Sequence, residues 1–451
     1  MNLTNGMMNL TSRMMTRTVL NLLLILLLCL VACEGASGEE WEEDDFDELS
    51  SESFDDESDE FDENEEFDDE DEAFEDEAFD DEAFDDEREE SDTVVFIPTV
   101  ISAMADVSAC RLADRDSEIE IGVGFPRASV AAPSTGVVTV KLLFVDFDDA
   151  PASVSPFDIM ETFVDSAEIL HTMSYGHLTV EFDPVDQWLR LGENSQDYFR
   201  LTDDLDVNAK RDIMAEAVAA ADDIVDFSAV DVVYIFASDT VNHGESYHSY
   251  SEDVSADGSL VQQFAVSSEA YFDSAMVETV VHELGHAFGL TDLYDYHDQD
   301  IHKHVGGFDI MGNISGRAPG MMAFHRWMLD WIDDDQIYCQ QTDEATVHLS
   351  PIEQADGVKA AVVPISDQQA VVVESRRALG LDANIFKEGA LVYLVNADRE
   401  NAEAGMIVYP DRGDEQKNEA PLSVGESVTV EGVTIEVVEA GADGDVINVT
   451  R

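Results

Sequence analysis

A mixed α/β (α+β) domain followed by a mainly β domain is the fold class that the sequence predicts. Between residues 131 and 340, runs of β-branched and aromatic residues alternate with helical patterns, as is typical of α/β domains. Beyond residue 341, short apolar segments recur between turns and indicate antiparallel strands. These observations predict two folded domains, at 131–340 and 341–451, with residues 93–130 as an N-terminal extension.

The first 33 residues predict an export signal. Arg13 and Arg17 precede an apolar run over 19–32, which has the length of a secretory signal and is too short to span a bilayer comfortably. The run ends in LVAC at 30–33, which resembles a bacterial lipobox and implies cleavage before Cys33 and lipid attachment to its sulfur. An ordinary signal peptide is the alternative. Both readings predict an exported protein, either a bacterial cell-surface lipoprotein held at the membrane through this lipid or an extracellular protein.

Residues 34–92 form a low-complexity acidic tract, and the whole chain has a formal net charge of −79. Charge repulsion and scarce apolar residues predict that this tract is a disordered linker. So acidic a surface repels nucleic acid, and no nucleic-acid partner is expected.

The expected elements of the α/β domain follow in order along the chain. Residues 137–147 (VVTVKLLFVDF) predict a buried strand by their length and β-branched content. The other expected elements are a helix at 156–171, a strand at 178–182, a helix at 207–224, a central strand at 232–237 and an edge strand at 263–266. The strands expected in the β domain are 360–364, 370–374, 390–395, 427–430 and 434–438.

The most informative segment surrounds His282, Glu283 and His286. On a helix, the two histidines lie one turn apart on one side, while Leu284 and Phe288 lie on the opposite, apolar side. Two neutral imidazole nitrogens at this spacing suit a zinc ion. Glu283 follows the first histidine directly and can reach a water on the metal, so it is the predicted general base and acid.

A third ligand is expected after the helix ends. Gly289 permits the chain to turn back, and Asp292 can then reach the metal. Three protein ligands leave one position open for water, which is typical of a catalytic zinc. His297, His302 and His304 follow closely and are alternatives for the third ligand.

Two cysteines remain for the exported part of the chain. Cys110 and Cys339 are expected to form a disulfide in an oxidising compartment. They could instead stay as separate buried thiols, or Cys110 could bind the metal in a latent form.

Several other residues allow an ordinary structural role as well as a functional one. Asp295 could orient a histidine ligand, bind a structural calcium ion or be an ordinary surface residue. His243 and His248 are expected to be exposed to solvent. Trp327 and Trp331 are expected to pack in the core.

The sequence around the histidines resembles a known family. Residues 282–292 (HELGHAFGLTD) are similar to the extended motif of immune inhibitor A-type metalloproteases, relatives of the metzincins. That family has aspartate as the third ligand, which the resemblance places at Asp292. Residues 308–312 (FDIMG) resemble its Met-turn, which implies that Met311 lies beneath the zinc.

Two further segments are similar to that family, SYGHL at 174–178 and GALVY at 389–393. The resemblance covers about residues 130–451 and implies a metzincin-like zinc protease domain, a Zn2+ cofactor, and protein or peptide substrates. The chain departs from the pattern in one respect, because no tyrosine lies two places after Met311, and the group that would stabilise an oxyanion is left open.

Together these observations predict a secreted, lipid-anchored zinc endopeptidase. The alternative is an inactive protease scaffold that acts as a cell-surface binding protein. The intact motif argues against the alternative, since a decayed scaffold would usually lose Glu283 or one of the histidines.

Overall fold

The computed structural model describes residues 106–115, 121–199, 207–238, 246–268, 275–298, 300 and 302–451. All of them belong to one unit, residues 94–451. The predicted signal peptide, the lipid-bearing Cys33, the acidic tract and His243 lie outside the described residues. Among the described helices, none combines the length and the apolarity that crossing a membrane requires.

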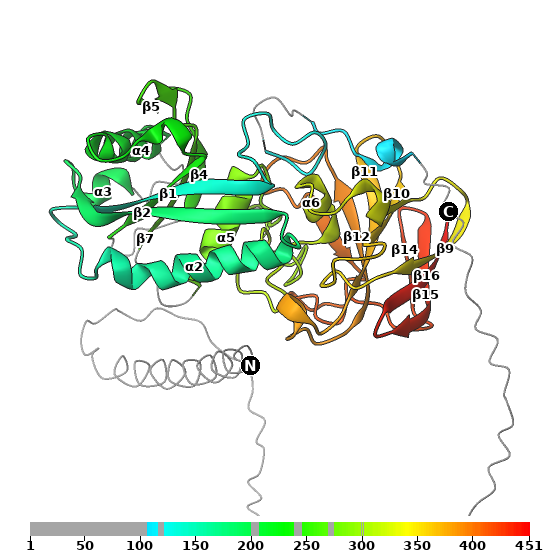
Figure 1. Ribbon diagram of the computed structural model, residues 1–451. Helices are drawn as coiled ribbons and strands as arrows, with labels where there is room; N and C mark the ends of the chain where they lie inside the picture. Colours follow the sequence, from blue (N-terminus) through cyan, green and yellow to red (C-terminus); the bar gives the residue numbers. More distant parts are fainter. Residues whose placement is uncertain are drawn as a thin grey trace, which may run out of the picture. The chain divides into compact units, whose positions relative to one another are not determined.

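A five-stranded sheet forms the centre of the N-terminal half (Figure 1). Its order is β2-β1-β3-β7-β4, in which β4 is antiparallel to β7 and the other neighbours are parallel. The strands are β1 (Gly136–Asp146), β2 (Leu178–Arg190), β3 (Val232–Ala237), β4 (Tyr247–Tyr250) and β7 (Gln263–Ser268). The short strands β5 (Ser255–Ala256) and β6 (Ser259–Leu260) pair with each other.

Helices cover both faces of this sheet (Figure 1). They are α2 (Pro156–Met173), α3 (Ser195–Tyr198), α4 (Val207–Ala221) and α5 (Met276–Ala287). Helix α2 begins where the Ser155 hydroxyl accepts a hydrogen bond from the Asp158 N–H at 3.3 Å, and Pro156 occupies the first turn, where its missing N–H costs nothing.

The side chains of β1 alternate between two cores, because successive residues of a strand point to opposite faces. Val140, Leu142 and Phe144 join the core that contains α2 and α5. Leu143 and Val145 join the second core, which contains residues of α4. The predicted strand is therefore buried on both faces, as its continuous apolar run indicated.

The predicted elements of this half are confirmed, with two differences. Strand β2 continues to Arg190, well beyond the predicted end at residue 182. The prediction that 263–266 is an edge strand is wrong, because β4 pairs with the outer side of β7. The four residues of β4 (YHSY) form a segment too short to show a periodic pattern, so this strand was not predicted.

The C-terminal half contains two packed sheets. Their orders are β13-β12-β11-β10-β8 and β14-β15-β16-β9. The strands of the first are β8 (Ile337–Cys339), β10 (Ala360–Pro364), β11 (Gln369–Arg376), β12 (Gly389–Asn396) and β13 (Met406–Tyr409). Those of the second are β9 (Glu344–Leu349), β14 (Ser427–Val430), β15 (Val433–Gly441) and β16 (Gly444–Thr450). Alternate residues of β11, Val371 and Val373, face the core between the two sheets.

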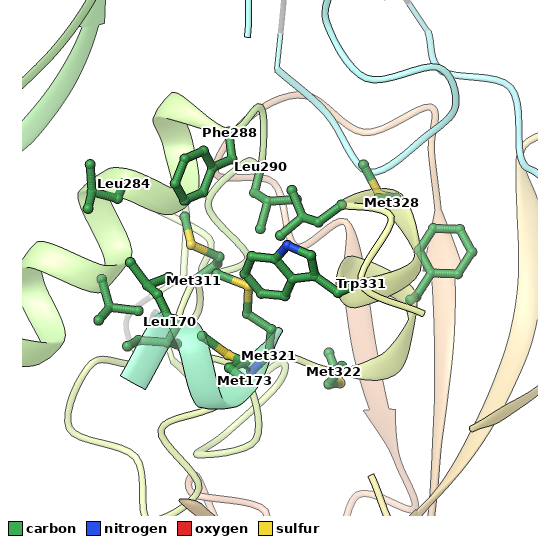
Figure 2. Packing of buried hydrophobic residues seen from close by; sticks show 14 of the residues in the cluster. Leu170, Met173, Leu284, Phe288, Leu290, Met311, Met321, Met322, Met328 and Trp331 are labelled. Atoms are coloured by element: carbon green, nitrogen blue, oxygen red, sulfur yellow. Dashed lines mark hydrogen bonds between the residues drawn. The ribbon is translucent and has the colours of Figure 1, made fainter. Parts of the chain in front are cut away.

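One core joins the two halves of the chain. Val372 of β11 and Tyr393 of β12 belong to the same cluster as the residues beneath α2 and α5. Figure 2 shows Trp331 among the methionines of this cluster, next to Met311 and Met321. Trp327, in α6 (Ala323–Met328), and Trp331 are fully buried, as expected.

The described part of the N-terminal extension packs into this core. Cys110, Leu112 and Val123 are buried, so ordered structure begins before the expected start near residue 130. Cys110 forms a disulfide with Cys339 of β8, 229 residues further along the chain. The pairing confirms the predicted disulfide and excludes the two alternatives, separate thiols and a Cys110 metal ligand.

A buried ionic network connects the first C-terminal sheet to the N-terminal half. Arg376, fully buried on β11, pairs with Glu374 and Asp382, each at 2.8 Å. It also donates a hydrogen bond to the Phe308 carbonyl at 2.6 Å. Glu374 in turn accepts from the Ala323 N–H at the start of α6, at 2.6 Å. Two distant parts of the chain are thus held together by charges that have no access to water.

We expect the substitution Arg376→Met to lower the free energy of unfolding by about 3–5 kcal/mol, because it leaves two buried carboxylates without their cation. The exposed pair of Arg412 with Glu426 provides the control, and Arg412→Met should cost less than about 1 kcal/mol. Urea unfolding of both variants measures the difference. Equal losses would show that the buried network does not support the fold in this way.

Candidate metal centre

The chain turns at the end of α5, between His286 and Asp292, which are two of the candidate ligands. Gly289 has φ +96°, a left-handed conformation that favours glycine. Its N–H donates to the His286 carbonyl at 2.8 Å, and the Leu290 N–H donates to the Gly285 carbonyl at 3.0 Å. This pair of hydrogen bonds is a Schellman motif, which ends the helix and reverses the chain. The prediction that Gly289 ends the helix is confirmed.

Three ligand atoms meet beyond this turn. The Nε2 atoms of His282 and His286 lie 3.1 Å apart. Oδ1 of Asp292 lies 3.1 Å from the first and 3.2 Å from the second. Ligands held at about 2.0–2.1 Å around a tetrahedral zinc lie about 3.3 Å from one another. The structure thus brings together the three residues that the sequence predicts as ligands, at separations that suit one ion.

The hydrogen bonds of the two histidines indicate which ring nitrogen of each can bind a metal ion. Nδ1 of His282 lies 2.9 Å from the Ile310 carbonyl, and Nδ1 of His286 lies 2.8 Å from the Leu290 carbonyl. Since a carbonyl accepts, each neutral ring carries its proton on Nδ1 and directs a lone pair from Nε2. Asp292 Oδ1 is buried and accepts no hydrogen bond from the described residues, although it approaches both nitrogens. This donor set is suited to bind a cation.

The ionisation of the cluster follows from the same proximity. Burial opposes the charge on Asp292, but the imidazoles of His286 and His282 lower the pKa of its carboxyl far below the usual range. Burial would likewise lower the pKa of His286, yet the negative charge of Asp292 raises it to about 9. The carboxylate therefore attracts positive charge, whether a proton on His286 or a metal ion, to this point.

Glu283 lies on the same helix turn and is 3% exposed. Burial raises the pKa of its carboxyl above the usual range, against the opposing effect of the two histidines. Its Oε2 has no hydrogen-bond partner among the described residues. A buried carboxylate with a free oxygen beside a ligand set is suited to accept a proton.

Met311 packs directly against α5. A Cβ atom at Gly285 would lie 2.5 Å from its Sδ, so a larger residue at this position of the helix would force the Met311 side chain to move. Figure 2 shows Met311 beside Leu284 and Phe288, on the apolar side of the helix. That Met311 lies beneath a metal stays a prediction.

Asp309 is a residue whose importance the sequence did not reveal. Its carboxylate is fully buried and accepts from the N–H groups of Met311 and Met322, at 2.9 and 2.8 Å, and lies 3.0 Å from Nδ1 of His325. It thereby fixes the turn that presents the Ile310 carbonyl to the imidazole of His282. Only its position inside the FDIMG segment could have drawn attention to it.

The alternative third ligands lie elsewhere. His297 is exposed, Nδ1 of His302 lies 2.6 Å from the Gly312 carbonyl, and Nε2 of His304 lies 3.0 Å from Asp298. Asp295, Asp298 and His304 form a second cluster whose side chains could hold a metal ion.

A structural calcium ion at these three residues stays a prediction. Lys303 pairs with Asp298 at 2.7 Å and would compete with a cation there.

The expectation that His248 is exposed is wrong. It is half-buried on β4, donates to or accepts from Gln263 at 2.6 Å, and its ring lies 6.0 Å from that of His286.

A pocket of about 400 Å³ opens over His282 and Glu283. Tyr294 lines it, and its ring lies parallel to the His282 ring with centroids 6.4 Å apart. Burial and the negative charge of Asp292 raise the pKa of the Tyr294 hydroxyl, so it stays protonated. Tyr294 lies two places after Asp292, whereas the family pattern directed attention to the position two places after Met311. The other lining residues are Ser246, Thr279, Tyr296, His302 and residues 312–315.

Comparisons with known proteins gave one family match, which includes His282, Glu283 and His286 and ends one residue before Asp292. Residues 189–291 match the family described as metallo-peptidase family M12B, reprolysin-like. This match supports a metallopeptidase domain, and the more specific resemblance to immune inhibitor A-type proteases stays a prediction. A comparison with curated protein sequences gave no significant match.

Two solved structures are similar to parts of the chain. Metalloproteinase-II from Bacteroides fragilis matches with 15% identity and a TM-score of 0.27, over 49% of this chain and 57% of that one. The chain thus spans little more than half the length of that structure. Wild-type OgpA from Akkermansia muciniphila matches with 10% identity and a TM-score of 0.26, over 72% of this chain and 95% of that one.

Proposed function

We propose that the chain is a zinc-dependent endopeptidase that hydrolyses peptide bonds in proteins. The observation that carries this proposal is the meeting of three potential ligand atoms, from His282, His286 and Asp292, near the Glu283 carboxylate, whose Oε2 has no hydrogen-bond partner among the described residues. The reprolysin-like match over residues 189–291 supports the same reaction class. Bound there, zinc would supply Lewis acidity, which activates water and polarises a carbonyl.

The protein side chains would hold the ion, transfer the proton and stabilise the developing negative charge. His282, His286 and Asp292 would hold the ion and leave one position open toward the pocket. Glu283 would take a proton from the attacking water and deliver it to the leaving amine. Tyr294, protonated and in the same pocket, would donate a hydrogen bond to the oxygen on which negative charge develops.

The position of β4 supports a polypeptide substrate. Within the described residues, β4 lies at the edge of the sheet and pairs with β7 alone. Ser246, which directly precedes β4, lines the pocket with Glu283. An extended peptide that forms backbone hydrogen bonds with such an edge would pass beside the ligand cluster.

We expect Glu283→Gln to lower casein hydrolysis by about 10²–10⁴-fold while the zinc content stays the same, because the amide cannot accept the proton. Glu278→Gln is the matched control, since Glu278 is a half-buried residue of the same helix that does not line the pocket. Activity assays with metal analysis measure both. Stoichiometric zinc without activity in the unchanged protein would favour the binding-protein alternative.

We expect Tyr294→Phe to reduce kcat by about 10²-fold with little change in KM, because a hydroxyl that acts in the transition state does not contribute to substrate binding. Zinc content should not change. Tyr409→Phe, a substitution outside the pocket, serves as the control. A change in KM alone would assign Tyr294 to substrate binding instead.

We also propose that the protein is exported and held at a membrane by a lipid on Cys33. The disulfide between Cys110 and Cys339 supports an oxidising compartment. In a bacterial host, the unchanged chain should partition into detergent and Cys33→Ser should stay in the aqueous phase. Identical partitioning of the two would contradict lipid anchoring.

A further inference from the structure

The third ligand is held differently from the two histidines. His282 and His286 lie on α5, but Asp292 lies on residues 290–293, which belong to no helix or strand. Its neighbour Leu293 is tied to the Met311 carbonyl through its N–H, at 3.0 Å. The geometry of the ligand set therefore depends on what holds Asp292 itself.

Asn401 provides that contact. Its Oδ1 accepts a hydrogen bond from the Asp292 N–H at 2.8 Å and a second from the hydroxyl of Thr291. Thr291 and Asp292 are 2% and 6% exposed, so these two donors lie in a region where loss of a partner costs free energy. One side-chain oxygen thus binds both the ligand residue and the residue before it.

Asn401 belongs to the C-terminal half of the chain. It lies on the loop 397–405, between β12 and β13, which is closed by a hydrogen bond from the Asn396 N–H to the Gly405 carbonyl at 2.8 Å. Ala402 and Ala404 adopt left-handed conformations, with φ of +57° and +53°. Such conformations are costly for alanine and persist where surrounding contacts require them.

The same loop follows the metal-binding segment beyond Asp292. The Ala404 N–H donates to the Tyr294 carbonyl at 3.4 Å, and Glu403 forms an isolated antiparallel bridge with Asp295. Loop 397–405 therefore runs alongside residues 291–295 and contacts them at successive points. Asn401 supplies the contact that lies at the ligand.

We propose that Asn401 is a positioning residue for the metal centre, through which the C-terminal β region holds the third ligand in place. The inference rests on the proposed zinc site. Residues that orient metal ligands without touching the ion typically change metal affinity by about 10–100-fold when they are removed. Asn401 is exposed, so its truncation creates no cavity in the core. The loss of its oxygen costs some stability at the buried donors of Thr291 and Asp292, and beyond that cost it should weaken metal binding.

The test is zinc affinity of the full chain, measured by competition with a chromophoric chelator. Asn401→Ala should weaken binding by about tenfold or more. Asn401→Asp retains the accepting oxygen and should stay within about threefold of the unchanged protein. The matched control is Asn448→Ala. Asn448 lies on β16, and its Oδ1 also accepts from a threonine hydroxyl, that of Thr346 on β9, at 2.7 Å.

Thermal unfolding of each variant without and with zinc distinguishes positioning from general support. The inference requires that zinc raises the unfolding temperature less for Asn401→Ala than for Asn448→Ala, whatever stability each metal-free variant has lost. Unchanged affinity in Asn401→Ala, or an equal loss in Asn448→Ala, would overturn it. Absence of zinc binding by the unchanged chain would instead remove the proposed function, and the inference with it.

Discussion

The convergence of two buried imidazoles and a buried carboxylate is the constraint on which the centre of this molecule depends. Two imidazole nitrogens and a carboxylate oxygen lie within 3.2 Å of one another, and the hydrogen bonds at both Nδ1 atoms direct lone pairs into the same space. Such an arrangement does not assemble by itself, because each donor would be more stable in water. The surrounding helix end, turn and loop must therefore hold it in place.

The C-terminal half contributes to that support at several places. Arg376 donates to the carbonyl of Phe308, directly before Asp309, whose carboxylate fixes the turn that holds His282. Tyr393, on β12, accepts from the Phe324 N–H at 3.2 Å. Because one hydrophobic core continues from the α/β sheet to β11 and β12, the two halves form a common scaffold around the metal-binding segment.

The distribution of charge also has a structural consequence. The chain has only 22 Lys and Arg against 101 Asp and Glu, yet several of its cations are buried. Arg326 donates to the Met321 carbonyl at 2.8 Å, Lys359 donates to the Pro351 carbonyl at 3.0 Å, and Arg377 pairs with Asp445 at 2.8 Å. These few Lys and Arg side chains thus contact buried carbonyls and carboxylates that water cannot reach, while the surface stays acidic.

The local features of this protein could be predicted from its residues alone. The periodicity of α5 placed His282 and His286 on one side, Gly289 ended the helix, and apolar runs predicted most strands, because these properties depend on neighbours close along the chain. Only the tertiary structure showed that β4 covers β7, that Asp309 supports the turn beneath the helix, and that Asn401 contacts Asp292 from more than 100 positions away. These contacts arise from chain packing, which leaves no periodic signal in the residues that it brings together.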